Sequence, residues 1–393
     1  MNLKRLHRKD FFSTVERVVV KIGSGVLTKE SGLNLKVVES VSRQICRLME
    51  TGVEVILVSS GAMATGIRKM GFSKRPDEIP KRQAIAAIGQ AGLILEYEKM
   101  FDRFGKKVAQ ILLTAEDLSS RVRYLNARNT LNTLVSWNVL PIINENDTVV
   151  TAEIKVGDND NLSAAIALLL DADLLINLTD IDGLYTKNPK TEKDAVLIPV
   201  VTEIDAATEA IAIGLPGTLG TGGMLTKITA ARKVTAAGIP MIITNGAREN
   251  VLLDLFAGEE LGTFFAPGKE KMNSRKCWIA FNLKPKGQLM IDEGAANALS
   301  MQGKSLLPIG VKQVTGRFNV GDPVEFFSLS GARLGVGLVN YNSADIDRIK
   351  GLKSAAIAHV LGSKPYDEVV HRDNLVLTVK PETVAPQGGK REP

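Results

Sequence analysis

The chain has 393 residues, of which 45% are hydrophobic and 23% are charged, and it carries a net charge of +6. The length predicts two or three domains, the composition excludes a largely disordered chain, and no apolar stretch approaches the ~20 residues of a membrane span. Two cysteines, Cys46 and Cys277, cannot form a disulfide framework, and the basic start lacks the apolar run of a secretory signal, so we expect a cytoplasmic protein without a membrane partner.

The first 265 residues alternate between predicted strands and predicted helices. Strands are expected at 17–22, 53–58, 108–113, 139–143, 174–178 and 239–244. Helices are expected at 35–49, 81–104, 124–136, 162–170 and 228–237, with a short one from Val251. This alternation predicts an α/β fold with a mostly parallel sheet sandwiched by helices. By its length, the helix at 81–104 is a candidate contact in a homo-oligomer.

The pattern changes after Thr263, where a polar and basic linker is expected at 267–276. Strand-like runs follow at 278–281, 288–291, 310–314, 324–327 and 334–339, with one small helix at 295–301. They predict a separate small β-barrel domain. The positive excess of the chain lies in this part, and a plain solvated surface is favoured over a polyanion site. The tail from Lys380 is expected to be disordered.

An acidic stretch, residues 144–161, follows the predicted strand at 139–143. The stretch contains a single cation, Lys155, and five carboxylates: Glu145, Asp147, Glu153, Asp158 and Asp160. Crowded carboxylates repel one another unless a metal, an ammonium group or N–H donors balance them. A solvated acidic turn is the alternative. Open α/β sheets bind ligands beyond the carboxyl ends of their strands, so we interpret the stretch as a substrate and metal loop.

A second loop, residues 214–227, contains five glycines and precedes a predicted helix. Its backbone N–H groups and the helix N-terminus suit anionic phosphate oxygens. Lys227 and Lys21, which lies near the end of the first strand, would supply positive charge to a transferring phosphoryl group. Surface or structural lysines are the alternative, and the pairing with glycine loops favours the functional interpretation.

Histidine is absent between His7 and His359, which excludes Ser-His and Cys-His nucleophile systems from that region. The phosphate-binding pattern Gly-x-x-x-x-Gly-Lys-Ser/Thr is absent as well. A carboxylate acceptor is already ionised at neutral pH and requires no base. The residues present therefore permit a kinase that makes an acyl phosphate.

Six motifs resemble those of the glutamate 5-kinases, a family of the amino-acid kinase superfamily. They are Val-Lys-Ile-Gly-Ser (20–24), Val-Ser-Ser-Gly-Ala (58–62), Asn-Glu-Asn-Asp (144–147), Glu-Ile-Lys-Val-Gly-Asp-Asn-Asp-Asn-Leu-Ser (153–163), Leu-Thr-Asp-Ile-Asp-Gly-Leu-Tyr-Thr (178–186) and Gly-Thr-Gly-Gly-Met-Leu-Thr-Lys (220–227). The resemblance spans nearly all of residues 15–375, and Gly25 departs from it where relatives often carry Ser or Thr.

The resemblance implies ATP-dependent phosphorylation of the L-glutamate γ-carboxylate, the first step towards proline, with Mg²⁺ and with feedback inhibition by proline. It implies a homo-oligomer, a dimer or tetramer, and glutamyl phosphate reductase as a partner. The expected domains are an amino-acid kinase domain at 15–266 and a PUA-like domain at 285–378, with an N-terminal extension at 1–14 and a disordered tail at 379–393.

Carried over by position, the resemblance gives three catalytic residues. Lys21 would contact the ATP phosphates, Lys227 would stabilise charge on the transferring group, and Asp160 would orient the lysines or Mg²⁺. The glutamate-binding residues would be Ser60, Asp147 and Asn159. The nucleotide would contact Lys21, Thr179, Asp180, Thr221, Gly222, Gly223, Met224, Leu225, Thr226 and Lys227. No residue is assigned as a metal ligand.

Two alternatives remain at this stage. One is a sister kinase that acts on aspartate, acetylglutamate, carbamate or uridylate, against which the 158–161 stretch and the C-terminal domain argue. The other is an RNA-binding or regulatory protein that uses the C-terminal domain. Only 5% of the chain is aromatic, so base stacking is poorly supplied and a structural or regulatory domain is favoured.

Overall fold

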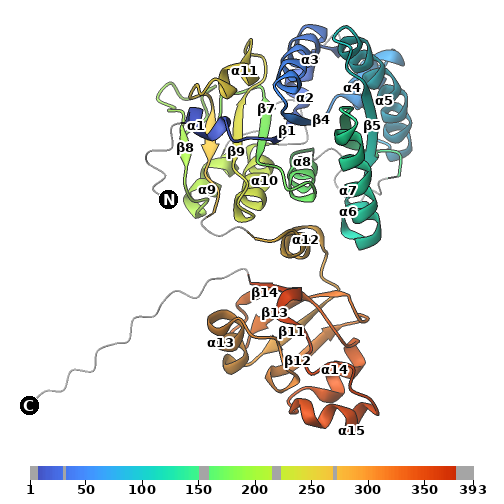
Figure 1. Ribbon diagram of the computed structural model, residues 1–393, viewed down its shortest axis with the longest axis vertical. Helices are drawn as coiled ribbons and strands as arrows, with labels where there is room; N and C mark the ends of the chain where they lie inside the picture. The colour runs from blue at the N-terminus through green and yellow to red at the C-terminus, as the bar shows by residue number, and fades with distance from the viewer. Residues whose placement is uncertain (1–7, 30–31, 150–158, 215–222, 269–271, 378–393) are drawn as a thin grey trace, which may run out of the picture. The chain divides into compact units, whose positions relative to one another are not determined.

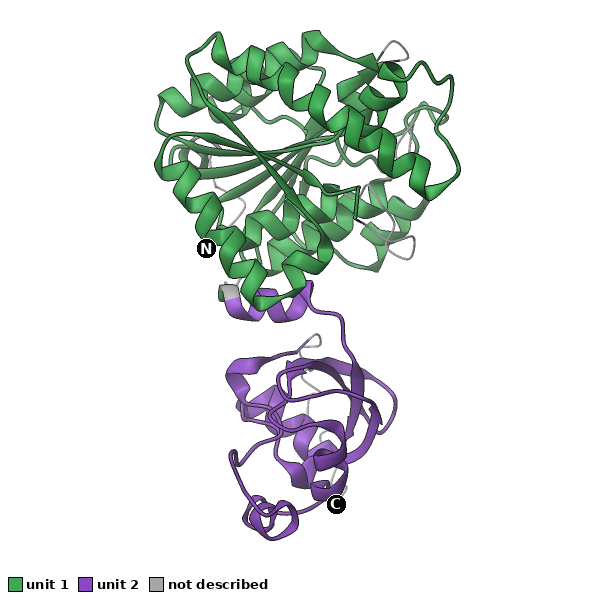
Figure 2. Ribbon diagram, turned by 90° about the vertical axis from the view of Figure 1, so that its right-hand side faces the viewer, with its two compact units in different colours: residues 1–274 green, residues 275–393 purple. Residues whose placement is uncertain are grey.

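The computed structural model describes residues 8–29, 32–149, 159–214, 223–268 and 272–377. The chain forms two compact units, residues 1–274 and 275–393, which are coloured separately in Figure 2. The expected disordered tail at 379–393 and most of the N-terminal extension lie outside the described residues. Within that extension, α1 (Arg8–Phe12) is described, and its Phe12 packs against Phe256 with 2% of its surface exposed.

An eight-stranded sheet forms the centre of the first unit, in the order β5-β6-β4-β1-β7-β9-β10-β8. The bounds are β5 Val108–Leu113, β6 Leu140–Glu145, β4 Glu54–Ser59, β1 Arg17–Ile22, β7 Leu174–Thr179, β9 Met241–Asn245, β10 Thr263–Phe265 and β8 Val200–Val201. Every neighbouring pair is parallel except β9 and β10. The expected mostly parallel sheet is therefore confirmed.

Helices cover both faces of this sheet (Figure 1). On one face, α3 (Leu35–Glu50), α5 (Ile79–Asp102) and α11 (Val251–Phe256) close a large apolar core over β1, β4 and β7. On the other face, α8 (Asn159–Leu169) packs against the same strands, and α10 (Met224–Ala236) packs against α8 and β9. The remaining helices are α2 Ser24–Leu27, α4 Ala62–Lys69, α6 Ala115–Ser119, α7 Arg121–Ser136 and α9 Ala206–Gly214, and a small hairpin pairs β2 Thr28–Lys29 with β3 Gly32–Leu33.

Alternation along β1 decides which side chains each face receives. Val18, Val20 and Ile22 belong to the core under α3, so the intervening Val19 and Lys21 point to the face of α8. A lysine on a strand that is buried from Val18 to Ile22 therefore faces the helix that carries Asp160. The register sets Lys21 beside Asn177 of β7, which points to the same face.

The second unit is built on a five-stranded sheet in the order β12-β11-β13-β14-β15. Its elements are α12 Ser274–Asn282, β11 Gly287–Ile291, α13 Glu293–Gln302, η2 Pro308–Gly310, β12 Val311–Gly316, β13 Pro323–Ser328, β14 Arg333–Leu338, α14 Ser343–Ile349, η3 Ser354–Ala356, α15 Ile357–Leu361, η4 Arg372–Asn374 and β15 Leu375–Leu377. An apolar core that includes Leu289, Phe326 and Ile346 holds the sheet and the helices together.

Some expectations about single elements are wrong. The expected strand at 278–281 lies within helix α12, because a short apolar run fits a buried helix as well as a buried strand. Helix α10 begins at Met224 and α8 at Asn159, so residues expected in loops occupy first helical turns. Helices α4, α6, α9, α14 and α15 and the short strands β8, β10 and β15 were not expected.

Among the described residues, no helix combines the length and the apolar character needed to cross a membrane.

Candidate active site

A buried carboxylate, Asp160, lies at the centre of the first unit's polar cluster. It sits in the first turn of α8 and its side chain is fully buried. Lys21 Nζ lies 2.6 Å from its Oδ1, and Lys227 Nζ lies 3.1 Å from its Oδ2. These two lysines are 4% and 6% exposed, so three charged groups share one enclosed position. The structure thus brings the three predicted catalytic residues together.

Two neutral groups complete the bonding of this carboxylate. Asn177 Nδ2 donates to Oδ1 at 2.7 Å, and Thr226 Oγ1 donates to Oδ2 at 2.7 Å. Burial alone would raise the pKa of Asp160, but the charges of Lys21 and Lys227 and the hydrogen bonds outweigh burial and hold its pKa well below the usual range. The group is therefore an anion throughout the physiological range.

The fold explains why these side chains meet. Lys21 and Asn177 are neighbours on β1 and β7 and point to one face, where α8 and α10 lie against each other. Asp160 at the start of α8 also benefits from the positive end of that helix dipole. Lys227 lies in the first turn of α10, which is capped by Gly223. Because glycine has no side chain, the first N–H groups of α10 remain available to a ligand.

A second polar chain starts at Asn159, the neighbour of Asp160. Asn159 Nδ2 donates to Ser60 Oγ at 2.8 Å and to Asn144 Oδ1 at 3.0 Å. Asn144 Nδ2 in turn donates to Gln90 Oε1 at 2.8 Å. The Oδ1 atom of Asn159 is buried and has no hydrogen-bond partner among the described residues. A buried acceptor without a donor is a position where a ligand N–H or ammonium group would bind.

Asp147 lies two residues beyond the carboxyl end of β6. It lines a cavity of about 250 Å³ together with residues of α5 and β5, among them Gln90 and Gln110. Burial and the nearby Glu145 raise the pKa of Asp147 to about 6, with Arg75 opposing the shift. This carboxylate would gain by pairing with a cation in the cavity. Glu153, Lys155 and Asp158 of the predicted acidic loop lie outside the described residues.

Among the described nucleotide-binding residues that the resemblance predicts, Thr179 and Asp180 lie at the end of β7, and residues 223–227 lie at the start of α10. Thr179 is buried at the end of β7 and its hydroxyl donates to Asp180 Oδ1 at 3.2 Å, while Asp180 is exposed. Met224 is buried, and Leu225 is 43% exposed in the same helical turn. Thr221 and Gly222 lie outside the described residues.

Within the described ranges, no group of three or more His, Cys, Asp or Glu side chains is placed to hold a metal ion. Mg²⁺ in nucleotide-using enzymes commonly binds to one or two carboxylates and to the substrate's phosphates rather than in an all-protein cage. The exposed carboxylate of Asp180, directly after β7, fits such a metal.

Sequence reasoning missed Asn177 and Gln90. It includes Asn144 in the predicted substrate and metal loop at 144–161 but gives this residue no role of its own. A signal for Asn177 does exist in the chain, since it is the single amide within the apolar run Leu-Leu-Ile-Asn-Leu-Thr of a fully buried strand. A polar side chain in such a strand needs a buried partner. Gln90 gives no comparable signal, because it lies on a long helix of mixed character.

Comparison with known proteins gives the chain's relatives. A model of the Amino acid kinase family matches residues 16–245, and a model of the PUA domain matches residues 287–361. The glutamate 5-kinase of Geobacter sulfurreducens is 51% identical over 94% of this chain and 100% of its own length. The glutamate 5-kinases of Caldanaerobacter subterraneus and Syntrophus aciditrophicus are 51% and 50% identical, over 93% and 94% of this chain and 99% and 96% of their own.

Proposed function

The chain belongs to the amino acid kinase family and, within it, to the glutamate 5-kinases, and from this we infer that it transfers the γ-phosphoryl group of ATP to the γ-carboxylate of L-glutamate. The product is L-glutamyl 5-phosphate, an acyl phosphate on the route to proline. The observation that supports this chemistry best is the carboxylate of Asp160, which holds two buried lysines on the face of the sheet that α8 covers.

Phosphoryl transfer requires positive charge at the transferring oxygens and an acceptor in line with the leaving group. Lys21 and Lys227 supply that charge on the face of the sheet that α8 covers, where both ammonium groups bind Asp160. Asp160 positions both ammonium groups, and its negative charge offsets the repulsion between them. The acceptor carboxylate is ionised at neutral pH, so the reaction needs no general base.

ATP would bind with its phosphates near Lys21, Lys227 and the N-terminus of α10. Thr179, Asp180 and the segment from Thr221 to Thr226 are proposed to hold the rest of the nucleotide. Mg²⁺, when bound to the phosphates, supplies charge neutralisation for the transfer. Asp180, the exposed carboxylate that follows β7, would hold that ion.

Glutamate would bind across Asn159, Ser60 and Asp147. The α-ammonium group would pair with Asp147, whose pKa is raised by burial and by the nearby Glu145. The unpartnered Oδ1 of Asn159 would accept a hydrogen bond from the bound substrate. Gln90 and Asn144 would fix the orientation of the Asn159 amide.

Other features remain proposals that follow from the family. We propose a cytoplasmic homo-oligomer, a dimer or tetramer, that is inhibited by proline and works beside glutamyl phosphate reductase. A subunit contact on α5 is supported by Ile88 and Leu95, which expose 37% and 46% of their surface on that helix. Both cysteines are buried and free, as suits a reducing compartment.

The test is Mg-ATP turnover with hydroxylamine as a trap for the acyl phosphate, with L-glutamate, L-aspartate, N-acetylglutamate and carbamate as acceptors. We expect hydroxamate from glutamate and its loss in Lys227→Ala. Lys233→Ala is the matched control, because this lysine lies on the same helix but binds the Asn161 side chain instead of Asp160. Turnover with another acceptor would keep the chemistry and reject glutamate as the substrate.

A further inference from the structure

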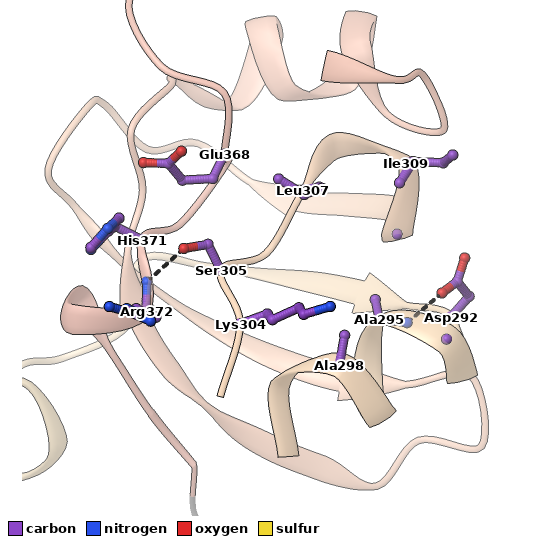
Figure 3. Close-up of a pocket in the computed structure, with 12 residues that line it drawn as sticks. Asp292, Ala295, Ala298, Lys304, Ser305, Leu307, Ile309, Glu368, His371 and Arg372 are labelled. Carbon is purple, nitrogen blue, oxygen red and sulfur yellow. Dashed lines mark hydrogen bonds between the residues drawn. The ribbon is translucent and has the colours of Figure 1, made fainter. Parts of the chain in front are cut away.

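The second unit contains a groove that the kinase reaction does not use. Its volume is about 710 Å³, within the range of small-molecule sites. It lies between α13 and the segment that leads into β12, with the 368–372 segment on its far side (Figure 3). The residues that line it are Asp292, Gly294, Ala295, Ala298, Lys304, Ser305, Leu307, Ile309, Gly310, Glu368, His371 and Arg372.

One wall of the groove is apolar. Leu307 and Ile309 are 42% and 43% exposed, although branched aliphatic side chains of this size are usually buried. Ala295 and Ala298 of α13 face the same space. Together these four side chains offer a surface that a compact aliphatic body would cover, with a gain from the hydrophobic effect.

The polar groups of the groove leave a cation available. The Lys304 side chain extends into the groove beside Ala298 (Figure 3), and its ammonium group has no hydrogen bond or ion pair among the described residues. Arg372 is anchored by its backbone N–H, which donates to Ser305 Oγ at 3.0 Å. Its guanidinium group lies 4.0 Å from Asp373, a loose and exposed contact.

The two acidic side chains of the groove, Asp292 and Glu368, differ in their partners. Asp292 already pairs with Lys312 at 2.9 Å and accepts from the backbone N–H of Ala295. Glu368 accepts from Asn340 Nδ2 at 3.3 Å on the opposite side of the groove from α13. The Lys304 ammonium group lies on the side of the groove next to α13, whereas Arg372 and Glu368 lie on the opposite side (Figure 3). A ligand with one acid group therefore fits Lys304, whereas a ligand with several would be repelled by Glu368.

We propose that this groove binds a small organic acid, which places one carboxylate or phosphate group at Lys304 and an aliphatic body against Leu307 and Ile309. Nucleic acid is disfavoured by the same residues. None of the described residues that line the groove is Phe, Tyr or Trp, so bases have no side chain on which to stack. Two cations opposed by Glu368 also neutralise few backbone phosphates.

The test uses three probes that share one six-carbon body, namely hexanoate, hexyl phosphate and hexanol, with the full chain and ligand-observed saturation-transfer NMR. We expect hexanoate or hexyl phosphate to bind, and hexanol to bind about tenfold more weakly because it lacks the charge-assisted hydrogen bonds. The stronger of the two acids identifies the acid group. Lys304→Ala should weaken that acid by about tenfold and leave hexanol unchanged.

Two matched controls separate the groove from the general surface. Ala298→Trp should fill the groove and abolish binding of the acid, whereas Asn297→Trp, at an exposed position of the same helix outside the lining, should not. Lys353→Ala removes an exposed lysine elsewhere in the unit and should have no effect. Urea unfolding followed by far-ultraviolet circular dichroism serves as the check that each variant is folded.

Equal binding of hexanol and the acids, or equal binding to all four variants, would overturn the proposal. So would a single-stranded RNA oligonucleotide that binds in the groove and is lost in Lys304→Ala while neither acid binds. The proposal concerns the second unit and does not depend on the kinase assignment.

Discussion

The substitution Asp160→Asn tests the central claim that one carboxylate holds the two lysines of the site. The asparagine keeps the shape of the side chain but removes its charge. Lys21 and Lys227, at 2.6 and 3.1 Å, then lose their counter-ion while they remain buried. Removal of one partner from a buried ion pair costs ~3–5 kcal/mol, and because Asp160 is fully buried no reduction for solvent screening applies. We expect the free energy of unfolding of the first unit to fall by that amount.

Asp171→Asn is the matched control for this experiment. Asp171 lies 2.7 Å from Arg128, but the two side chains are 41% and 36% exposed. Surface pairs contribute ~0–1 kcal/mol, so this substitution should be nearly neutral. Asp171 has a φ of 50°, a conformation that asparagine tolerates well, so the backbone adds no separate cost.

The assay is urea unfolding followed by far-ultraviolet circular dichroism, with and without Mg-ATP. Phosphate groups would replace the missing negative charge, so ATP should stabilise Asp160→Asn more than it stabilises the unsubstituted protein. The pKa of Asp160 is lowered in the folded state, so its contribution is complete above the unfolded value of about 4 and is lost as the pH falls further. If Asp160→Asn and Asp171→Asn destabilised equally near pH 7, the proposed role of Asp160 would be wrong.

Three further predictions concern the substrate side, the helix packing and the missed amide. The pKa of Asp147 is raised to about 6, and the neutral acid cannot pair with an ammonium group. We therefore expect kcat/KM for glutamate to fall as the pH drops through about 6. Asp147→Asn should lose this pH dependence in steady-state assays. Gly89→Ala would place a Cβ atom 1.8 Å from the carbonyl oxygen of Ala62, so α4 would have to move away from α5. We expect the free energy of unfolding to fall by at least about 2 kcal/mol in urea titrations. Asn177→Ala removes a 2.7 Å hydrogen bond to Asp160 and should lower the free energy of unfolding by ~1.5–3 kcal/mol in urea titrations. Because Asp160 is then held less firmly, we also expect a lower kcat with a smaller change in KM for ATP.

Each of these predictions has a control and an outcome that contradicts it. For the pH dependence, an unchanged profile in Asp147→Asn would show that another group titrates. Gly294→Ala places its Cβ no closer than 3.5 Å to Asp292 and should be neutral or stabilising, so equal damage from both glycine substitutions would reject the packing argument. Asn245→Ala loses a hydrogen bond to the exposed Asp182 and should leave kcat nearly unchanged; equal losses would reject a special role for Asn177.

The sequence determined the α/β architecture, because apolar strands that alternate with amphipathic helices have few other ways to bury their surface. It also indicated Lys21 and Lys227, since lysines beside glycine loops at strand ends and helix starts carry a local signal, whereas the role of Asp160 followed only from the family resemblance. Local signals were less reliable for the run at 278–281, where a short apolar segment is compatible with either a helix or a strand, and the chain forms α12.

Tertiary structure alone decided which side chains share the site. The register of β1 and β7 sets Asn177 beside Lys21, and the packing of α10 on α8 brings Lys227 to Asp160, 67 positions away along the chain. The hydrogen bonds that link Gln90, Asn144 and Asn159 likewise depend on the distance between α5 and β6. Such contacts come from strand order and helix packing, which are set by the whole core, so no local pattern in the sequence encodes them.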